Sequence, residues 1–193
     1  NCMPLDPVTF QRAQVRSAAV DWSGAPAHGL SLQDLDPLQI ERARQVLRSK
    51  APSSGLLELP DPAFLSGLEA LREGQVTHAG MLLFARREVL AQRCPQAQFH
   101  YVLHDGETSV ARNDIDRLPL LEAVERMEQV FTGPLNPEKE IELGLFKLRI
   151  PQFPVEGVRE AVLNALTHRD YLNPGEILVR HSTKELVVTS PGG

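Results

Sequence analysis

Cysteine is nearly absent from this sequence, which holds only Cys2 and Cys94. The two lie far apart and form no Cys-x-x-Cys pair, so we expect neither a structural zinc site nor a disulfide framework, and a reducing cytoplasm suits the chain. No apolar run approaches the roughly 20 residues that span a bilayer, and the start lacks the charged and apolar segments of a signal peptide. We therefore expect a cytoplasmic protein without a membrane partner.

An excess of positive charge is also lacking. The formal net charge is −5 and the pI is near 5.7, whereas a nucleic-acid-binding domain usually carries a basic patch. The nearest candidates are two short clusters, one running from Arg42 to Lys50 and the other formed by Arg86 and Arg87. We expect both to be ordinary solvated surface, and we expect this chain to bind duplex DNA weakly at most.

What the sequence does contain is a regular pattern of apolar residues, which make up 42% of its 193 residues. Helical spacing, with Asp-Pro start signals in two cases, predicts helices over residues 36–49, 61–71, 120–131 and 155–168. Alternation predicts a strand over 98–104, and the apolar residues of 140–150 predict an extended segment or a hairpin arm. Residues 176–181 and 185–189 are predicted to form an antiparallel pair joined around residues 182–184. Residues 77–86 fit either a short helix or a buried strand. This mixture of helices and antiparallel strands indicates an α+β fold.

The chain divides into three predicted parts. Residues 1–34 are expected to form a connecting arm, with a short helix from Thr9 to Ala19 and with Trp22 anchoring the arm on the globular part. Residues 35–150 form a central α+β module, whose first two helices fit either a winged helix or ordinary helix packing. Residues 151–193 form the last part. The start at Asn1 and the stop at Gly193 indicate a piece of a longer protein.

The predicted helix over 155–168 carries a file of polar side chains. Glu156, Glu160, Asn164 and His168 are four residues apart, so they share one side of the helix. A carboxylate, an amide and an imidazole in this arrangement suit an Mg²⁺ or phosphate-water site, because a hard cation prefers oxygen ligands. The alternative is that this stripe simply faces water, as one side of most helices does. His168 and the neighbouring Arg169 also suit the negative end of the helix.

Two motifs carry a family resemblance. The first is Glu160-x-x-x-Asn-Ala-x-x-His-Arg-Asp-Tyr171, followed by the strand pair and by Ser-Pro-Gly-Gly at 190–193. The second, over residues 75–84, reads Gln-Val-Thr-His-Ala-Gly-Met-Leu-Leu-Phe. Together they resemble bacterial RecG-related transcriptional regulators, which join a Schlafen/AlbA-type DNA-binding domain to a degenerate ATPase-like module of the GHKL type. The resemblance covers roughly residues 30–193 and implies that the fold ends in a truncated GHKL-like helix and hairpin.

The resemblance also implies site residues. Asn164 would hold Mg²⁺ against nucleotide phosphates and Glu160 would activate the attacking water, while His168, Gly192 and Gly193 complete the candidate cofactor-binding set. The adenine-reading Asp of the GHKL glycine box has no counterpart at Ser190-Pro-Gly-Gly, and the phosphate-covering lid would lie beyond Gly193. We therefore expect Mg²⁺ and ATP, if used, to bind only in the longer protein.

Three hypotheses follow for the function. The first is a binding and assembly module that links a DNA-binding domain, preceding this chain, to an effector or dimerisation region; its partners are DNA, through that domain, and a second copy in a homodimer. The second is an Mg²⁺-dependent ATPase or helicase-related enzyme in the longer protein. The third is a purely structural α+β domain.

Overall fold

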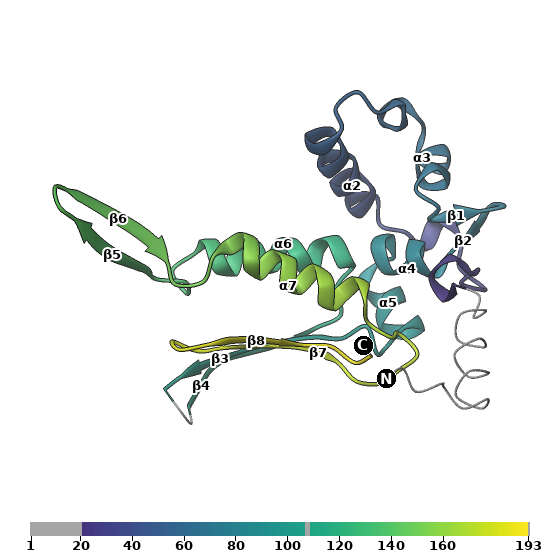
Figure 1. Cartoon of the computed structure of the whole chain (residues 1–193). Helices are drawn as coiled ribbons and strands as arrows, with labels where there is room; N and C mark the ends of the chain where they lie inside the picture. Colours follow the sequence, from purple (N-terminus) through teal and green to yellow (C-terminus); the bar gives the residue numbers. More distant parts are fainter. Residues whose placement is uncertain (1–20, 107–108, 193) are drawn as a thin grey trace, which may run out of the picture.

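Two hydrophobic clusters organise the chain (Figure 1). The structure is a computed structural model and describes residues 21–106 and 109–192. The first cluster draws its buried residues from positions 27–97 and from Tyr171, and the second draws them from positions 99–179. Within the described ranges, no helix has both the length and the apolar character required of a membrane span.

The first cluster is built from short helices and one small hairpin. Its elements are η1 Trp22–Gly24, η2 Leu32–Asp34, α2 Pro37–Lys50, η3 Gly55–Glu58, α3 Asp61–Gly67, β1 Leu71–Arg72, β2 Gln75–Val76, α4 His78–Phe84 and α5 Arg87–Arg93. Helix α2 begins as predicted, because the Asp36 side chain accepts a hydrogen bond from the backbone of Leu38 and Pro37 occupies the first helical position. α5 was not predicted from the sequence.

The ambiguous segment 77–86 forms helix α4. Thr77 caps it by accepting a hydrogen bond from the backbone N–H of Gly80 at 3.0 Å. A Cβ on Gly80 would lie 2.2 Å from the carbonyl oxygen of Ala70, so only glycine lets α4 pack this closely against the chain before it.

The prediction of one helix over 61–71 is wrong in its second half. α3 ends at Gly67, and Leu71–Arg72 instead pairs with Gln75–Val76 as a hairpin. Glu73 and Gly74 have φ values of 52° and 77°, which a two-residue hairpin turn requires and a helix does not permit.

The second cluster consists of a four-stranded sheet with two helices on one face (Figure 1). Its elements are β3 Phe99–Asp105, β4 Ser109–Asp116, α6 Leu120–Thr132, α7 Val155–Thr167, β7 Ile177–His181 and β8 Leu186–Thr189. The strand order is β4-β3-β7-β8, and the chain crosses from β3 to β7 through α6 and α7.

The α+β fold is confirmed, with one difference in the sheet. Antiparallel strands were expected, but β3 pairs in parallel with β7. The pairing is parallel because the long helical crossover returns the chain in the same direction. The pair β7–β8 is antiparallel as predicted, and β4 was not predicted. α7 has the predicted apolar side, since Val158, Val162, Ala165 and Leu166 are buried in the second cluster.

A second hairpin, which we call the arm, extends away from the body (Figure 1). It consists of β5 Glu138–Leu143 and β6 Phe146–Pro151, joined at Gly144 and Leu145. Of the two alternatives for residues 140–150, an extended segment or a hairpin, the structure shows the hairpin. Every residue of the two strands is exposed except the last, Pro151, which is half-buried.

Trp22 anchors the connecting segment, as predicted. Its ring stacks on His78 with centroids 4.1 Å apart and on Tyr171 with centroids 5.8 Å apart. The helix predicted from Thr9 to Ala19 lies outside the described residues. The three-part division at 34 and 150 remains a prediction.

Candidate functional site

The polar stripe of α7 lies on the exposed side of the helix. Asn164 donates a hydrogen bond from Nδ2 to Oε1 of Glu160 at 3.1 Å, and both side chains are exposed. Neither contacts the strand pair through a hydrogen bond or ion pair to a described residue. His168 is the C-cap of α7 and is also exposed. The stripe therefore brings Glu160 and Asn164 together on an open surface.

The Ser-Pro-Gly-Gly motif, as far as it is described, lies against the end of α7. The carbonyl of Pro191 accepts a hydrogen bond from the backbone of Asp170 at 3.0 Å, and Ser190 donates its hydroxyl to the carbonyl of Ala165 at 2.9 Å. Gly192 has a φ of 89°, and a Cβ there would lie 2.7 Å from that of Asp170. Gly193 lies outside the described residues.

These residues offer few metal ligands. Among positions 21–106 and 109–192, no group of three or more His, Cys, Asp or Glu side chains is placed to hold a metal ion. Glu160 and Asn164 could give Mg²⁺ two oxygen ligands, one from the carboxylate and one from the amide, and phosphates or water would have to complete its six. The cofactor roles of Glu160, Asn164, His168 and Gly192 therefore remain predictions.

A separate cavity of about 410 Å³ lies where the two clusters meet, beside the C-terminal end of α7. Most of its walls are apolar or aromatic, and the lining residues are Asp21, Trp22, Ser23, Ala79, Leu82, Leu83, Leu120, Leu166, Thr167, Arg169, Asp170, Tyr171 and Leu172. Tyr171 is held in place by a hydrogen bond from its hydroxyl to the carbonyl of Leu166 at 2.8 Å. This volume suits a small organic molecule.

Arg169 is the charged residue of this cavity that is buried, with 5% of its surface exposed. Its Nη2 donates to the carbonyl oxygens of Asn173 and Gly175. Its Nε and Nη1 are buried without a hydrogen-bond partner, and none of the described carboxylates lies within ion-pair distance. Burial also lowers the pKa of this guanidinium. The sequence indicated only that Arg169 suits the negative end of α7, and the structure adds that its side chain is buried there, with Nη2 bonded to the chain that follows the helix.

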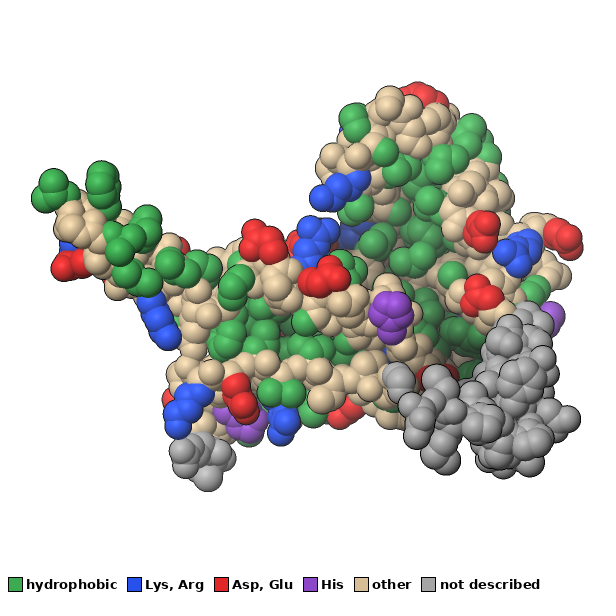
Figure 2. Space-filling model, viewed as in Figure 1, with side chains coloured by type: hydrophobic (Ala, Val, Ile, Leu, Met, Phe, Trp, Pro, Cys, Tyr) green, Lys and Arg blue, Asp and Glu red, His purple; other side chains and the backbone are tan. Residues whose placement is uncertain are grey.

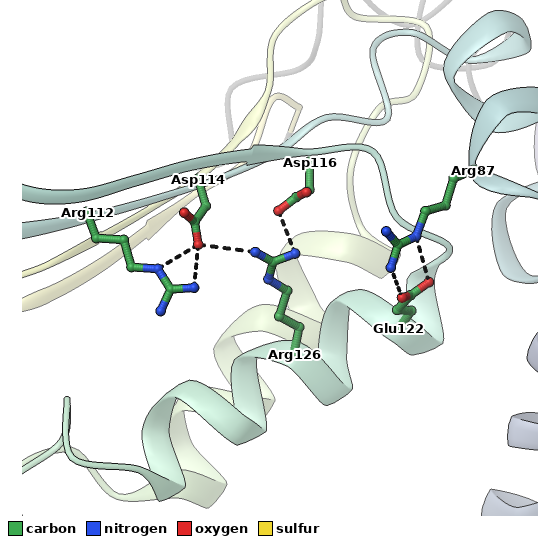
Figure 3. A network of polar contacts seen from close by, with 6 residues as sticks. All are labelled: Arg87, Arg112, Asp114, Asp116, Glu122 and Arg126. Carbon is green, nitrogen blue, oxygen red and sulfur yellow. Dashed lines mark hydrogen bonds and ion pairs between the residues drawn. The ribbon is translucent and has the colours of Figure 1, made fainter.

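A third polar region connects the two clusters around a hollow of about 620 Å³ (Figure 3). Glu122 on α6 pairs with Arg87 on α5 and with Arg42 on α2, the latter at 3.5 Å. Burial alone would raise the pKa of Glu122, but its hydrogen bond to Arg87 and the nearby arginine charges lower it.

The rest of this network is also charge-compensated. Arg126 lies 3.2 Å from Asp114 and 2.8 Å from Asp116, and Arg112 lies 2.7 Å from Asp114 (Figure 3). Of the basic clusters noted in the sequence, Arg48, Lys50, Arg86 and Arg87 are exposed as expected, and the expectation of solvated surface is wrong for the buried Arg44. Arg44, from the first cluster, is nearly buried and pairs with Asp61 at 2.9 Å.

Comparison with known proteins gives a partial match. Residues 10–100 match the model of a domain of unknown function, DUF8451, and this range contains the whole first hydrophobic cluster apart from Tyr171. The chain is similar to the DIP2311 protein from Corynebacterium diphtheriae, with 27% sequence identity and a TM-score of 0.71. That likeness covers 100% of this chain and 37% of the other, so the chain spans little more than a third of that protein's length. No curated protein matches the chain.

Proposed function

We propose that this chain is a binding and assembly module of a longer bacterial transcriptional regulator, and that the cavity beside Arg169 receives a small effector carrying a carboxylate or phosphate group. The observation that carries the proposal is the pair of unpartnered nitrogens, Nε and Nη1, on the buried Arg169 guanidinium. Nη2 is satisfied by two backbone carbonyls and the guanidinium lies 5.2 Å from the Tyr171 ring centroid, but each buried donor without an acceptor is costly, and an oxygen of a carboxylate or phosphate is a strong acceptor for such a donor.

The cavity walls support an effector with an apolar body. Trp22 and Tyr171 present aromatic rings, and Leu82, Leu83 and Leu120 add aliphatic surface. Apolar walls with a few placed polar groups are typical of small-molecule sites, as is a position between two packed units. Asp21 and Asp170 also line the cavity and would repel an anion at their side, so the anionic group is expected to lie toward Arg169.

Trp22 is the single tryptophan of the chain, so its fluorescence reports directly on this cavity. We expect phenylacetate to change Trp22 emission saturably and the neutral phenylacetamide to bind at least tenfold more weakly, because only the carboxylate pairs with the guanidinium. Arg169→Gln should abolish the preference for the acid, whereas Arg180→Gln, an exposed arginine outside the cavity, should retain it.

A second variant keeps the test of the cavity interpretable if Arg169→Gln misfolds. Ala79→Leu adds volume to the cavity wall without touching the guanidinium and should weaken phenylacetate binding. Equal binding of the acid and the amide to the wild-type chain, or no response of Trp22 to either one or to inorganic phosphate, would show that a water molecule satisfies Arg169 and would overturn the effector site.

The regulatory part of the proposal concerns DNA. Internal pairing of Arg42, Arg44 and Arg87 leaves little basic surface for phosphate contacts, and the net charge is −5. We expect no tight binding of a labelled duplex by residues 1–193 at physiological salt, and binding by the longer protein. Equal, tight binding by both would instead assign DNA recognition to the region of α2 and α3.

A second candidate is ATP hydrolysis by the longer protein. What favours it is the adjacency of Glu160 and Asn164 on an accessible face of α7. Mg²⁺-dependent turnover by the longer protein that disappears with Glu160→Ala would support this candidate. Turnover that survives the substitution would exclude the assigned role of Glu160.

A further inference from the structure

The arm exposes the largest apolar surface seen on any element of the described chain. Leu145 is 100% exposed and Phe146 is 74% exposed, and four further side chains, Ile141, Leu143, Leu148 and Ile150, are 43–57% exposed. None of these residues belongs to either hydrophobic cluster. Figure 2 shows hydrophobic side chains gathered on the projecting arm. Exposed patches of this kind on a folded protein usually mark a binding surface.

The strand register places these side chains on a single face. Ile141 lies opposite Leu148, and Leu143 lies opposite Phe146. Cross-strand partners point to the same side of a sheet, and so do residues two apart along a strand. Ile150 therefore shares this side as well, where it lies opposite Lys139 at the base of the arm. We call this side the apolar face of the arm.

The opposite face of the arm is polar and internally paired. Lys147 lies 2.7 Å from Glu140 and 3.4 Å from Glu142, and Arg149 lies 3.8 Å from Glu140. Residues 138–151 contain three glutamates and three basic residues, so the arm is neutral although the whole chain carries a net charge of −5. Apart from Lys139 at the base, the charged side chains of the arm lie on the polar face, and the arm has no net charge with which to repel a second arm.

An isolated two-stranded hairpin is only marginally stable in water, so the arm as described lacks the packing that normally holds such a structure. Its six large apolar side chains, each 43–100% exposed, form a patch on the order of several hundred Å². Each partner in a standard protein interface buries roughly 800 Å², so a single arm offers a substantial part of the surface for a stable contact with one partner.

We propose that the arm is a dimerisation element, whose apolar face packs against the same face of a second copy of this chain. A two-fold axis would place each apolar face on its equivalent, which is the commonest arrangement in homodimers. The neutral charge of the arm suits a second copy, whereas a strongly charged partner such as nucleic acid would find Lys147 and Arg149 already paired. This proposal deepens the assembly role proposed above and rests on it, but it is independent of the effector cavity.

Light scattering and sedimentation velocity of the 193-residue chain, from about 1 to about 100 µM, test the proposal. We expect a reversible monomer–dimer equilibrium. Phe146→Gln with Leu148→Gln should weaken dimerisation at least tenfold, because two central apolar contacts are lost. The matched control, Glu140→Gln with Arg149→Gln, changes an equal number of residues on the polar face and keeps the net charge, so it should change the dimer affinity by less than about threefold.

A second variant keeps the test valid if the double glutamine variant loses its hairpin. Replacing residues 139–150 with a short Gly-Ser linker removes the arm but none of the residues in the two hydrophobic clusters, and the product should be a cooperatively unfolding monomer. A wild-type chain that stays monomeric throughout, or a dimer that survives both changes, would overturn the proposal.

The alternative occupant of the apolar face is a lipid surface. Co-sedimentation of the wild-type chain with phosphatidylcholine vesicles, lost in the Phe146→Gln, Leu148→Gln variant, would assign the face to a membrane and contradict the dimer. Trp22 titrations of the same variants separate the two proposals, because removing the arm should leave phenylacetate binding unchanged. A chain that does not dimerise would therefore not contradict the effector site, and a cavity that binds no anion would not contradict dimerisation through the arm.

Discussion

Two of the antiparallel strand pairs, β7–β8 and the arm, are similar in length and have opposite environments. In the hairpin β7–β8, Ile177, Val179 and His181 are buried beneath the helices and beside β3. In the arm, the residues of β5 and of β6 up to Ile150 are all exposed. In both hairpins successive side chains point to opposite faces, and one of the two faces is mainly apolar. The alternation therefore determines which side chains share a face, but it does not determine what covers that face.

The difference has a consequence for function. The buried hairpin stabilises the body, and a substitution in it acts on folding. The arm contributes nothing to the two clusters, so its six apolar side chains are free to contact another molecule. Substitutions in the two hairpins should therefore separate stability from assembly.

The largest expected effect is on stability and comes from β7. Val179 is fully buried, so Val179→Ala should lower the free energy of unfolding by about 2 kcal/mol through lost packing and the cavity that remains. Ile141→Ala in the arm should change it by less than about 0.5 kcal/mol at concentrations where the chain is monomeric. Urea unfolding followed by circular dichroism measures both. Equal losses would show that the arm belongs to the cooperative fold.

An intermediate effect is expected from pH, again in β7. Nδ1 of His181 and the hydroxyl of Tyr101 share a hydrogen bond of 2.8 Å, burial lowers the His181 pKa, and burial raises the pKa of Tyr101 to about 12. The unfolded chain therefore binds a proton at His181 more readily than the folded chain, so this residue's contribution to stability is present above its ordinary pKa and is lost as pH falls through and below it.

The measurement is the free energy of unfolding at about pH 7 and about pH 5 for the wild type and for His181→Gln. The wild type should lose more stability on acidification than the variant does. His100, whose pKa is raised by its hydrogen bond to Glu176, contributes with the opposite sign, but it is present in both proteins and cancels in the difference. Identical pH dependence in the two proteins would show that His181 is not held neutral in the fold.

The smallest effect is expected on the outward side of α7, the helix that covers β7–β8. Glu160 is exposed, and among the described residues its side chain bonds to Asn164 alone, so Glu160→Ala should change the free energy of unfolding by less than about 0.5 kcal/mol. We also expect no ATP hydrolysis by residues 1–193, with or without the substitution, because the adenine-reading Asp and the lid have no counterpart in this chain. Phosphate release that depends on Glu160 would contradict this prediction.

The parts of the fold that were predicted correctly are those with strong local patterns. α2 has an Asp-Pro start, and α6 and α7 have apolar residues at helical spacing. The apolar residues of the arm recur at every second position along each strand, and β7–β8 is a pair of short, largely apolar runs bounded by turn residues. β4 gave no such signal, because Ser109–Asp116 is a largely polar edge strand with no buried residue. The parallel pairing of β3 and β7 depends on a crossover of more than seventy residues, which local periodicity does not report.

The candidate site was less predictable than the fold. Glu160 and Asn164 were correctly expected on one helix, but their role stays a prediction. The sequence did not predict the cavity, because its walls come from η1, α4, α6 and the end of α7, which are distant in sequence. Arg169 lies in the motif over residues 160–171 that carries the family resemblance. Charged residues are rarely buried, so the sequence of this motif gave no reason to expect buried nitrogens without a hydrogen-bond partner.

The most direct test of the assembly account is a cross-linking comparison of two adjacent arm residues that point to opposite faces. In a Cys2→Ser background, with Cys94 buried, Leu148→Cys and Arg149→Cys are oxidised at equal protein concentration. The account predicts that Leu148→Cys gives disulfide-linked dimers in high yield and that Arg149→Cys stays mainly monomeric. Equal yields from the two variants, or a higher yield from Arg149→Cys, would contradict packing of one apolar face against the other.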